Sequence, residues 1–487
     1  MNEIIPKPVL IQELDGFFAL TAETGIYVNP GSAEMVALGQ YLSGRVSPAT
    51  GYPFPVLVTD NPPIQGHIYL TQWDTAYLGE EGYQVMVTEA SLNVTANTPA
   101  GIRHAIQTIR QLLPAEIESE TPQPGPWTVP AGVITDYPTY TWRGMMLDVA
   151  RHFFSVAQVK RLIDQMAYYK MNRLHLHLTD DQGWRLAINS WPRLATHGGS
   201  TEAGGGPGGY YSQADYAEIV AYAQQYNIIV IPEVDLPGHT NAALASYAEL
   251  NANGIAPELY TGVQVGFSSL DANKELTYTF LNDVLGEIAA LTPGPYLHIG
   301  GDEAASTPPA DYKKFIERLQ SIVRAHGKIM IGWEEIGQTT LQAGVIAQHW
   351  HNNQMALQAA GQGANLILSP ATRTYLDIKY DEATVLGQNW AGYVNERAAY
   401  DWQPNQYIPD LPQEKILGIE AALWTESIET SDDMDVMIFP RLIGLAELAW
   451  SDPAGHSWDE YKTRLATHAS RLQAMGINFY RSHLVPW

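Results

Sequence analysis

Cysteine is absent from the 487 residues, so the chain forms neither disulfide bonds nor thiolate metal sites. Basic residues are scarce: 27 Lys and Arg stand against 52 Asp and Glu, and the formal net charge is −25. Nucleic acids and anionic membranes bind clustered Lys and Arg, so this balance argues against both as partners. Charged residues make up only 16% of the chain, below the roughly 25% typical of soluble proteins.

Long apolar segments and a leader sequence are also missing. No apolar run approaches the length of about 18 residues that a transmembrane helix needs. The first residues lack the basic start and apolar core of a signal peptide. We therefore expect a soluble protein, either cytoplasmic or a mature form from which a leader has been removed, and either a monomer or a homodimer.

The length of the chain predicts two domains, one of them large. Residues 1–137 are expected to form a small α+β domain, with strand-like runs at 66–70, 82–88 and 91–95. A helix opens after these runs, and its buried face is marked by Ile102, Ala105, Ile106, Ile109 and Leu113. Residues 114–130 are rich in Pro and Glu, which indicates a linker inside this N-terminal region.

Residues 138–487 change in texture, because short apolar strands now alternate with amphipathic helices, as in parallel βα units. The expected strands are 144–149, 173–178, 227–234, 296–299, 328–333, 345–350, 364–368 and 416–421. Their number and the length of the segment predict an α/β fold of the (β/α)₈ (TIM) barrel type. An open, doubly wound sheet is the alternative.

Asp302 and Glu303 follow the fourth expected strand directly, after Gly300 and Gly301. Neighbouring residues at a strand end point to opposite sides, so the two carboxylates would reach different atoms of one ligand. Catalytic groups gather at the C-terminal ends of barrel strands. The pair is therefore a candidate catalytic centre; the alternative is that both acids only cap the next helix.

Polar and aromatic residues also stand at or beyond the other strand ends. They are Arg151, Asp180, His239, Trp333, Trp350, Tyr375, Asp377, Trp390, Trp424 and Glu426. Carboxylates between indole walls describe a carbohydrate site, because aromatic rings pack on the apolar face of a sugar while acids and Arg bind its hydroxyls. A metal centre competes with this interpretation, since His175 and His177 share one face of a strand; no third ligand follows at a telling spacing.

Six segments together resemble the β-N-acetylhexosaminidases of glycoside hydrolase family 20. They are Trp142–Phe154, Leu174–Trp184, Pro237–His239, His298–Glu303, Tyr375–Asp377 and Leu423–Glu426. The resemblance is closest to bacterial members and covers residues 138–487, and the N-terminal region resembles the small domain before their barrel. It implies an exo-acting enzyme that hydrolyses terminal, non-reducing, β-linked GlcNAc or GalNAc from oligosaccharides or glycoconjugates, without a metal or cofactor.

The resemblance also implies substrate-assisted catalysis, in which the acetamido oxygen of the sugar attacks the anomeric carbon and configuration is retained. Glu303 is then the general acid/base, Asp302 and Tyr375 hold the acetamido group, and Asp180 with His239 stands behind Glu303. The implied sugar-binding residues are Trp333, Trp350 and Trp424 as walls, Trp390 at the rim, and Arg151, Asp377 and Glu426 on the hydroxyls. One alternative is a carbohydrate-binding protein on an inactive barrel, which would lack Asp302 or Glu303. A second alternative is a glycosidase on the same barrel that releases a disaccharide.

Overall fold

The computed structural model describes residues 1–487, which form two compact units. Unit 1 comprises Met1–Thr139, Ala167–Lys170 and Leu442–Trp487; unit 2 comprises Tyr140–Met166 and Met171–Arg441. The expected division after residue 137 therefore differs at the C-terminus, where residues 442–487 group with unit 1. No helix in the protein is both long enough and apolar enough to cross a membrane.

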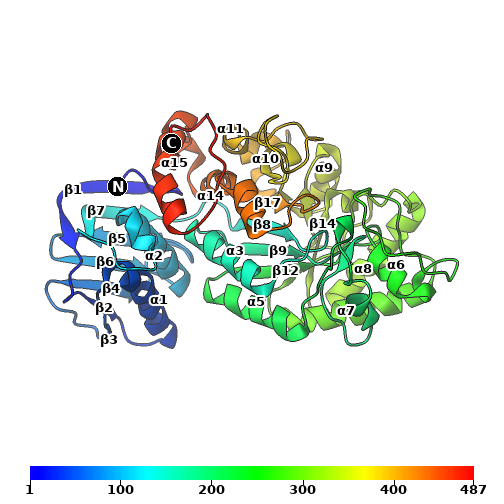
Figure 1. The fold of residues 1–487 in the computed structure, drawn as a ribbon, viewed down its shortest axis with the longest axis horizontal. Coiled ribbons are helices and arrows are strands. Elements are labelled where there is room, and N and C mark those ends of the chain that lie inside the picture. Colours follow the sequence, from blue (N-terminus) through cyan, green and yellow to red (C-terminus); the bar gives the residue numbers. More distant parts are fainter. The chain divides into compact units, whose positions relative to one another are not determined.

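Unit 1 is built on a seven-stranded sheet in the order β1-β7-β5-β6-β4-β2-β3 (Figure 1). Its strands are β1 (Leu10–Ala19), β2 (Gly25–Val28), β3 (Val56–Val58), β4 (His67–Gln72), β5 (Tyr83–Val87), β6 (Ser91–Ala96) and β7 (Thr128–Asp136). Helices α1 (Ala33–Thr50) and α2 (Pro99–Leu112) pack on the sheet and share one apolar core with it. The predicted buried face of α2 is confirmed, because all five of its marker residues lie in that core.

The segment predicted as a linker at 114–130 lies within unit 1 and is irregular only between residues 119 and 127. A 3₁₀ turn (Ala115–Glu118) and the first residues of β7 occupy the two ends of this segment, and β7 lies between β1 and β5 in the sheet. Pro130 is compatible with a central strand because it opposes Phe17 of β1 only; pairing with β5 begins later, at Gly132. Proline therefore removes no hydrogen bond from the β5 side of the ladder.

The C-terminal helix α15 (Trp458–Ala474) belongs to unit 1, and its buried Arg471 contacts the end of α2. The Arg471 guanidinium donates to the carbonyl oxygens of Arg110, Gln111 and Leu113, at 3.0, 2.6 and 2.5 Å. These carbonyls belong to the last turn of α2, whose acceptors have no partner within the helix. A contact across more than 350 positions in the sequence thus satisfies a helix end that no local pattern reveals.

Because of His468 on the same helix, we expect acid to lower the stability of unit 1. Its Nε2 lies 2.9 Å from the Glu3 carbonyl oxygen and its Nδ1 lies 3.2 Å from the Tyr169 hydroxyl. Burial, reinforced by the positive charge of Arg471, lowers the pKa of His468 from 6.5 to about 3. The unfolded chain binds this proton first, so the stability is present above pH 6.5 and is lost as the pH falls towards 3.

His468→Gln keeps a donor and an acceptor but has no proton to gain. Between neutral pH and about pH 5, we expect the wild type to lose about 2 kcal/mol of unfolding free energy relative to this variant. Urea unfolding of both proteins at the two pH values measures the difference. Parallel curves for the two proteins would contradict the assignment.

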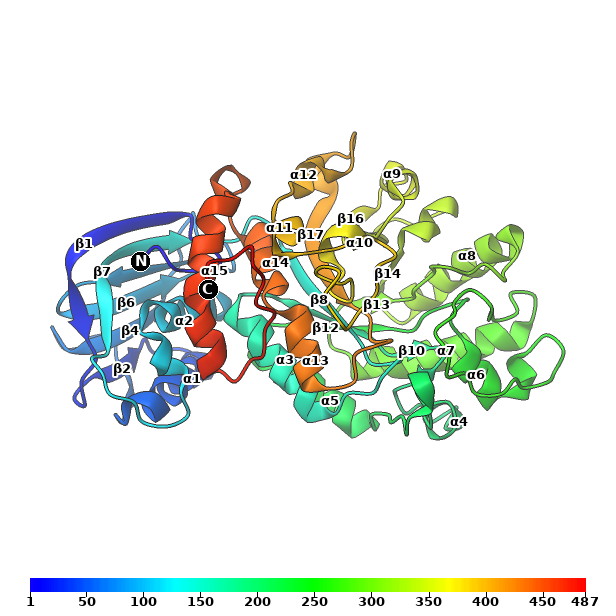
Figure 2. The same ribbon diagram turned by 45° about the horizontal axis from the view of Figure 1, so that its top comes forward.

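Unit 2 is a closed barrel of eight parallel strands (Figure 2). The strands are β8 (Trp142–Asp148), β9 (Arg173–His177), β12 (Ile229–Glu233), β13 (Tyr296–His298), β14 (Ile329–Trp333), β15 (Ile346–His349), β16 (Asn365–Leu368) and β17 (Ile416–Leu423). Each expected strand overlaps one of them. The pairing of β17 with β8 closes the barrel, which confirms the (β/α)₈ fold and excludes an open sheet.

Helices surround the barrel strands in Figures 1 and 2. The longer ones are α3 (Val156–Tyr168), α5 (Gln213–Gln225), α7 (Glu275–Leu291), α8 (Pro309–Ala325), α9 (Asn353–Gly361) and α13 (Ser431–Ile438). Short elements belong to the loops: β10 (Thr179–Asp180), β11 (Gly183–Trp184), α4 (Arg193–Thr196), α6 (Asn241–Ser246), α10 (Ala371–Thr374), α11 (Glu396–Tyr400) and α12 (Pro404–Tyr407).

The barrel interior is layered, and the layers position the strand ends. Ile231, Ile331 and Ile346 belong to one buried apolar cluster inside it. Two residues further along the same strands stand Glu233, Trp333 and Gln348, all buried. Because alternate residues share a face, an apolar layer is followed by a polar layer directly beneath the C-terminal strand ends.

Candidate active site

A cavity of about 430 Å³ opens at the C-terminal ends of the barrel strands, within the size range of small-molecule sites. Nine of the twelve predicted site residues line it: Arg151, Asp302, Glu303, Trp350, Tyr375, Asp377, Trp390, Trp424 and Glu426. Asp180, His239 and Trp333 are buried behind this lining. The structure therefore gathers the predicted residues from the ends of all eight barrel strands into one place.

Asp302 and Glu303 do not cap a helix. Helix α8 begins at Pro309, with Pro308 as its N-cap, so both acids precede the helix by several residues. They belong to a backbone turn in which Gly300 has a φ of 65° and Glu303 a φ of 45°. A Cβ on Gly300 would lie 1.7 Å from Asp235 Oδ1, so only glycine fits there.

A non-glycine residue in this left-handed region is uncommon, and such strain is concentrated at functional sites. The turn is held by two buried contacts: the Tyr312 hydroxyl donates to Gly301 O at 2.6 Å, and Gly301 N–H donates to Asp235 Oδ1 at 3.2 Å. His239, opposite Glu303, also has a positive φ of 55°. These contacts fix the directions of both carboxyl groups.

Glu303 combines access to the cavity with a buried partner. Its side chain is 37% exposed, whereas His239, whose Nε2 lies 3.4 Å from Glu303 Oε2, is 1% exposed. On the other side of the ring, His239 Nδ1 lies 3.1 Å from Asp180 Oδ1. Burial by itself would lower the pKa of His239, but the charges of Asp180 and Asp235 raise it well above its usual value.

Asp302 is more deeply placed than its neighbour. Its side chain is 10% exposed, and its Oδ2 lies 3.7 Å from His239 Nε2. Burial, together with the charge of Glu303 and against that of His239, raises the pKa of Asp302 to about 6. At neutral pH the group is therefore an anion, and its buried Oδ1 has no hydrogen-bond partner in the protein.

Aromatic rings form the cavity walls. Trp350 and Tyr375 are parallel, with an interplanar angle of 9° and centroids 6.4 Å apart, and Trp390 stands nearly perpendicular to both. Trp424 lines the cavity and packs at 5.9 Å against Trp333, which is buried behind it. Trp390 is 56% exposed, which places it at the rim. Such flat walls suit the apolar face of a sugar ring.

Two hydrogen bonds fix the orientation of these indoles. Trp333 Nε1–H donates to Glu233 Oε1 at 3.0 Å, and Trp350 Nε1–H donates to Glu335 Oε1 at 3.2 Å. The walls are thus rigid before any ligand binds, which lowers the entropic cost of binding.

Arg151, Asp377 and Glu426 form the polar side of the cavity. Arg151 Nη1 and Nη2 lie 3.2 Å from Asp148 Oδ2 and 2.9 Å from Asp180 Oδ2. Burial raises the pKa of Asp377 and of Glu426, each helped by a neighbouring carboxylate.

Several buried polar atoms on this side have no protein partner: Arg151 Nε, Asp377 Oδ1 and Glu426 Oε2. Buried polar groups in proteins are nearly always hydrogen-bonded. Cavity-lining residues with such unpartnered atoms therefore mark where a ligand with many hydroxyls would bind.

Four lining residues were not anticipated from the sequence: Val263, Val265, His351 and Gln388. The two valines belong to the long connection between β12 and α7, where no pattern points to the barrel mouth. Glu335 was also given no role, although it stands two residues after the strand end at Trp333. Its place close to the predicted site residue Trp333 in the sequence is the signal that could have identified it.

Both parts of the chain match known family models. Residues 140–453 match the glycosyl hydrolase family 20 catalytic domain, and residues 1–137 match glycosyl hydrolase family 20, domain 2. The chain is 41% identical over 490 residues to a β-N-acetylhexosaminidase of Cellulomonas fimi, and the alignment covers 99% of this chain and 97% of that protein.

Solved structures agree along the full length. The family 20 β-N-acetylhexosaminidase from Streptomyces coelicolor A3(2) is 52% identical with a TM-score of 0.97, covering 100% of this chain and 99% of that one. A mutant Streptomyces plicatus β-hexosaminidase in complex with its product GlcNAc is 51% identical with the same TM-score, covering 100% and 98%.

Proposed function

The chain belongs to glycosyl hydrolase family 20, and from this membership we propose that it is an exo-acting β-N-acetylhexosaminidase. It hydrolyses terminal, non-reducing, β-linked GlcNAc or GalNAc from oligosaccharides or glycoconjugates. The observation that carries the proposal is the Asp302–Glu303 pair at the end of β13, in a cavity with aromatic walls and unpartnered polar atoms. Arg151, Asp377 and Glu426 bind the sugar hydroxyls.

In the first step, the acetamido carbonyl oxygen of the substrate attacks the anomeric carbon and the bond to the glycosidic oxygen breaks. Glu303 donates its proton to the departing oxygen, and a cyclic oxazolinium ion forms. Asp302 accepts a hydrogen bond from the acetamido N–H and stabilises the positive charge of the ring. The Tyr375 hydroxyl donates a hydrogen bond to the acetamido carbonyl oxygen. An intramolecular nucleophile avoids the entropic cost of bringing in a second molecule.

In the second step, Glu303 accepts a proton from water, which attacks the anomeric carbon and reopens the ring. Two inversions give net retention. Trp333, Trp350 and Trp424 enclose the acetamido group and the sugar ring. Trp390 contacts the substrate at the rim of the cavity. The His239–Asp180 pair supports Glu303 through the 3.4 and 3.1 Å contacts behind it.

The proposed activity is tested by comparing β-linked nitrophenyl glycosides of GlcNAc, GalNAc and glucose under one set of conditions. We expect cleavage of the two N-acetylated substrates and at least a roughly 10³-fold lower kcat/KM for the glucoside, since an oriented intramolecular nucleophile is lost. Equal cleavage of all three would contradict a mechanism that depends on the acetamido group.

Tyr375→Phe is expected to lower kcat by about 10²-fold and to change KM little, because its hydrogen bond strengthens as the carbonyl oxygen attacks. The ring remains, so the stacking on Trp350 is kept. Steady-state kinetics with nitrophenyl GlcNAc separate the two constants. Tyr407→Phe, which loses a hydroxyl that contacts Thr372 away from the cavity, is the control. Equal losses in kcat and in affinity would count against this role.

A further inference from the structure

The buried polar layer beneath the cavity contains charged groups that the reaction steps do not use. Glu233 on β12 is paired in register with His177 on β9 and with His298 on β13. His175 lies two residues before His177 on the same inward face. None of these four side chains exceeds 1% exposure. A carboxylate buried this deeply is costly unless its surroundings compensate it.

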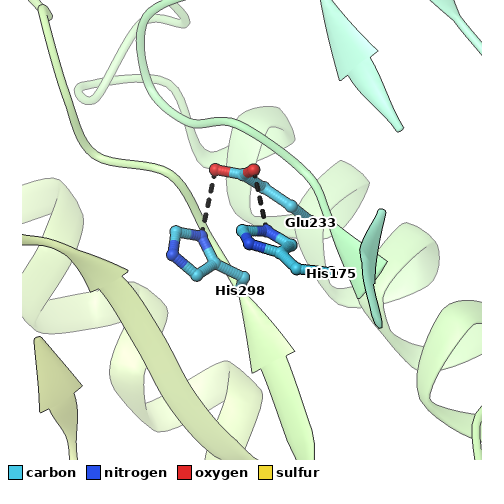
Figure 3. Close-up of side chains that lie close together, drawn as sticks. All are labelled: His175, Glu233 and His298. Carbon is cyan, nitrogen blue, oxygen red and sulfur yellow. Dashed lines mark ion pairs between the residues drawn. The ribbon is translucent and has the colours of Figure 1, made fainter. Parts of the chain in front are cut away.

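Three neighbouring groups compensate Glu233: the rings of His175 and His177 and the indole of Trp333. His298 does not, because its Nδ1 accepts from Gly300 N–H. Glu233 Oε2 lies 2.6 Å from His177 Nδ1 and 2.9 Å from His175 Nε2. Its Oε1 accepts from Trp333 Nε1–H at 3.0 Å and lies 3.0 Å from His298 Nδ1. Figure 3 shows the carboxylate directed at the rings of His175 and His298.

The arrangement of His175, Glu233 and His298 has the residue types of a metal centre, which was the competing interpretation of the sequence. The lone pairs that a cation would need are already engaged. His298 Nδ1 accepts from Gly300 N–H at 3.0 Å, and the Glu233 oxygens face Trp333 Nε1–H and the His177 ring. The cluster is therefore an internal ion-pair network.

Two paths lead from Glu233 to the cavity. The first runs through His177, whose Nε2 lies 2.8 Å from Asp180 Oδ2, and on to His239 and Glu303. Burial would lower the pKa of His177, but Glu233 and Asp180 raise it well above its usual value, so the ring donates to both. The second path is the direct hydrogen bond to the Trp333 indole.

On the basis of the proposed function, we propose that Glu233 is a positioning residue that holds the proton-transfer chain of Glu303 and the Trp333 wall in register with each other. Through His177 it sets Asp180 and His239 behind the acid/base. Through Trp333 it sets one side of the sugar pocket. The Glu233 carboxylate thereby positions both Glu303, which donates the proton, and the sugar whose glycosidic oxygen accepts it.

The proposal is tested with Glu233→Gln and two GlcNAc β-glycosides that differ in leaving group. A 2,4-dinitrophenyl group departs without protonation, whereas a 4-methoxyphenyl group needs the proton of Glu303. We expect kcat/KM to fall by about 10²-fold for the methoxyphenyl substrate and by about 10-fold or less for the dinitrophenyl substrate. The ratio of the two values is the readout, because loss of structure alone would lower both equally.

Glu420→Gln is the matched control. Glu420 is equally buried and its Oε1 lies 2.8 Å from His175 Nδ1, but it contacts neither His177 nor Trp333. Its substitution should leave the ratio as in the wild type. An unchanged ratio in Glu233→Gln, or the same shift in Glu420→Gln, would overturn the proposal.

Glu233→Asp covers the case in which Glu233→Gln does not fold. It keeps the buried charge but is one methylene shorter, so it cannot reach His177 and Trp333 together. We expect a smaller shift of the ratio in the same direction, and an unchanged ratio would again overturn the role of Glu233. Wild-type inactivity on both substrates would instead refute the proposed function itself, and the positioning role with it.

Discussion

Glu303→Gln is expected to remove nearly all hydrolysis of GlcNAc glycosides with poor leaving groups. Gln has the same shape but no proton to donate to the glycosidic oxygen and no basic oxygen to activate water. Loss of a general acid and base of this kind costs about 10²–10⁴-fold in rate. Folding should be intact, because the side chain is 37% exposed and its one ion-pair partner is His239.

The leaving group provides the internal check on this prediction. With 2,4-dinitrophenyl GlcNAc the first step needs no proton, so the variant should release dinitrophenol in a burst and then stall. Stopped-flow absorbance resolves the two phases. Glu258→Gln, which removes an exposed carboxylate, is the charge-matched control. Unimpaired turnover of a methoxyphenyl glycoside by Glu303→Gln would refute the assignment of the acid/base.

Asp302→Asn is expected to lower kcat by about 10²–10³-fold, the usual cost of removing one group that stabilises charge in the transition state. The neutral amide cannot stabilise the positive charge of the oxazolinium ion as an anion does. Ground-state binding of the sugar should change less, because the positive charge develops only as the ring closes.

The pH profile separates this role from a merely structural one. The pKa of Asp302 is raised to about 6, chiefly by burial. The anion is the active form, so the wild-type kcat/KM, which reports the free enzyme, should fall as the pH drops through about 6. The low activity of Asp302→Asn should lack that acid limb. Rates measured from about pH 4 to 8 give both profiles. A shared acid limb would assign the titration to another group.

The fold and most of the site could be predicted because local patterns in the sequence indicate them. Short apolar runs alternate with amphipathic helices, and period-two alternation within each run indicates which residues face the barrel interior. Polar residues at strand ends, such as Asp302 and Arg151, are then brought to one face by the parallel arrangement alone. The resemblance to a known family supplied the roles.

Contacts between distant segments could not be predicted in this way. The position of β7 between β1 and β5 in the sheet overrides the Pro-rich composition around residue 130, because pairing between distant strands is not encoded locally. Arg471 meets the end of α2 across the sequence, and Val263 and Val265 reach the cavity through a loop without a pattern.

Asp302–Glu303 illustrates the boundary between the two sources of information. The sequence by itself determined that two acids follow the fourth strand of a barrel, because strand periodicity and glycine placement are local properties. Only the tertiary structure decided that they do not cap α8, that Asp302 is the more buried of the two, and that Glu303 backs onto His239. Burial and charge depend on which strands become neighbours, and that is a property of the closed barrel.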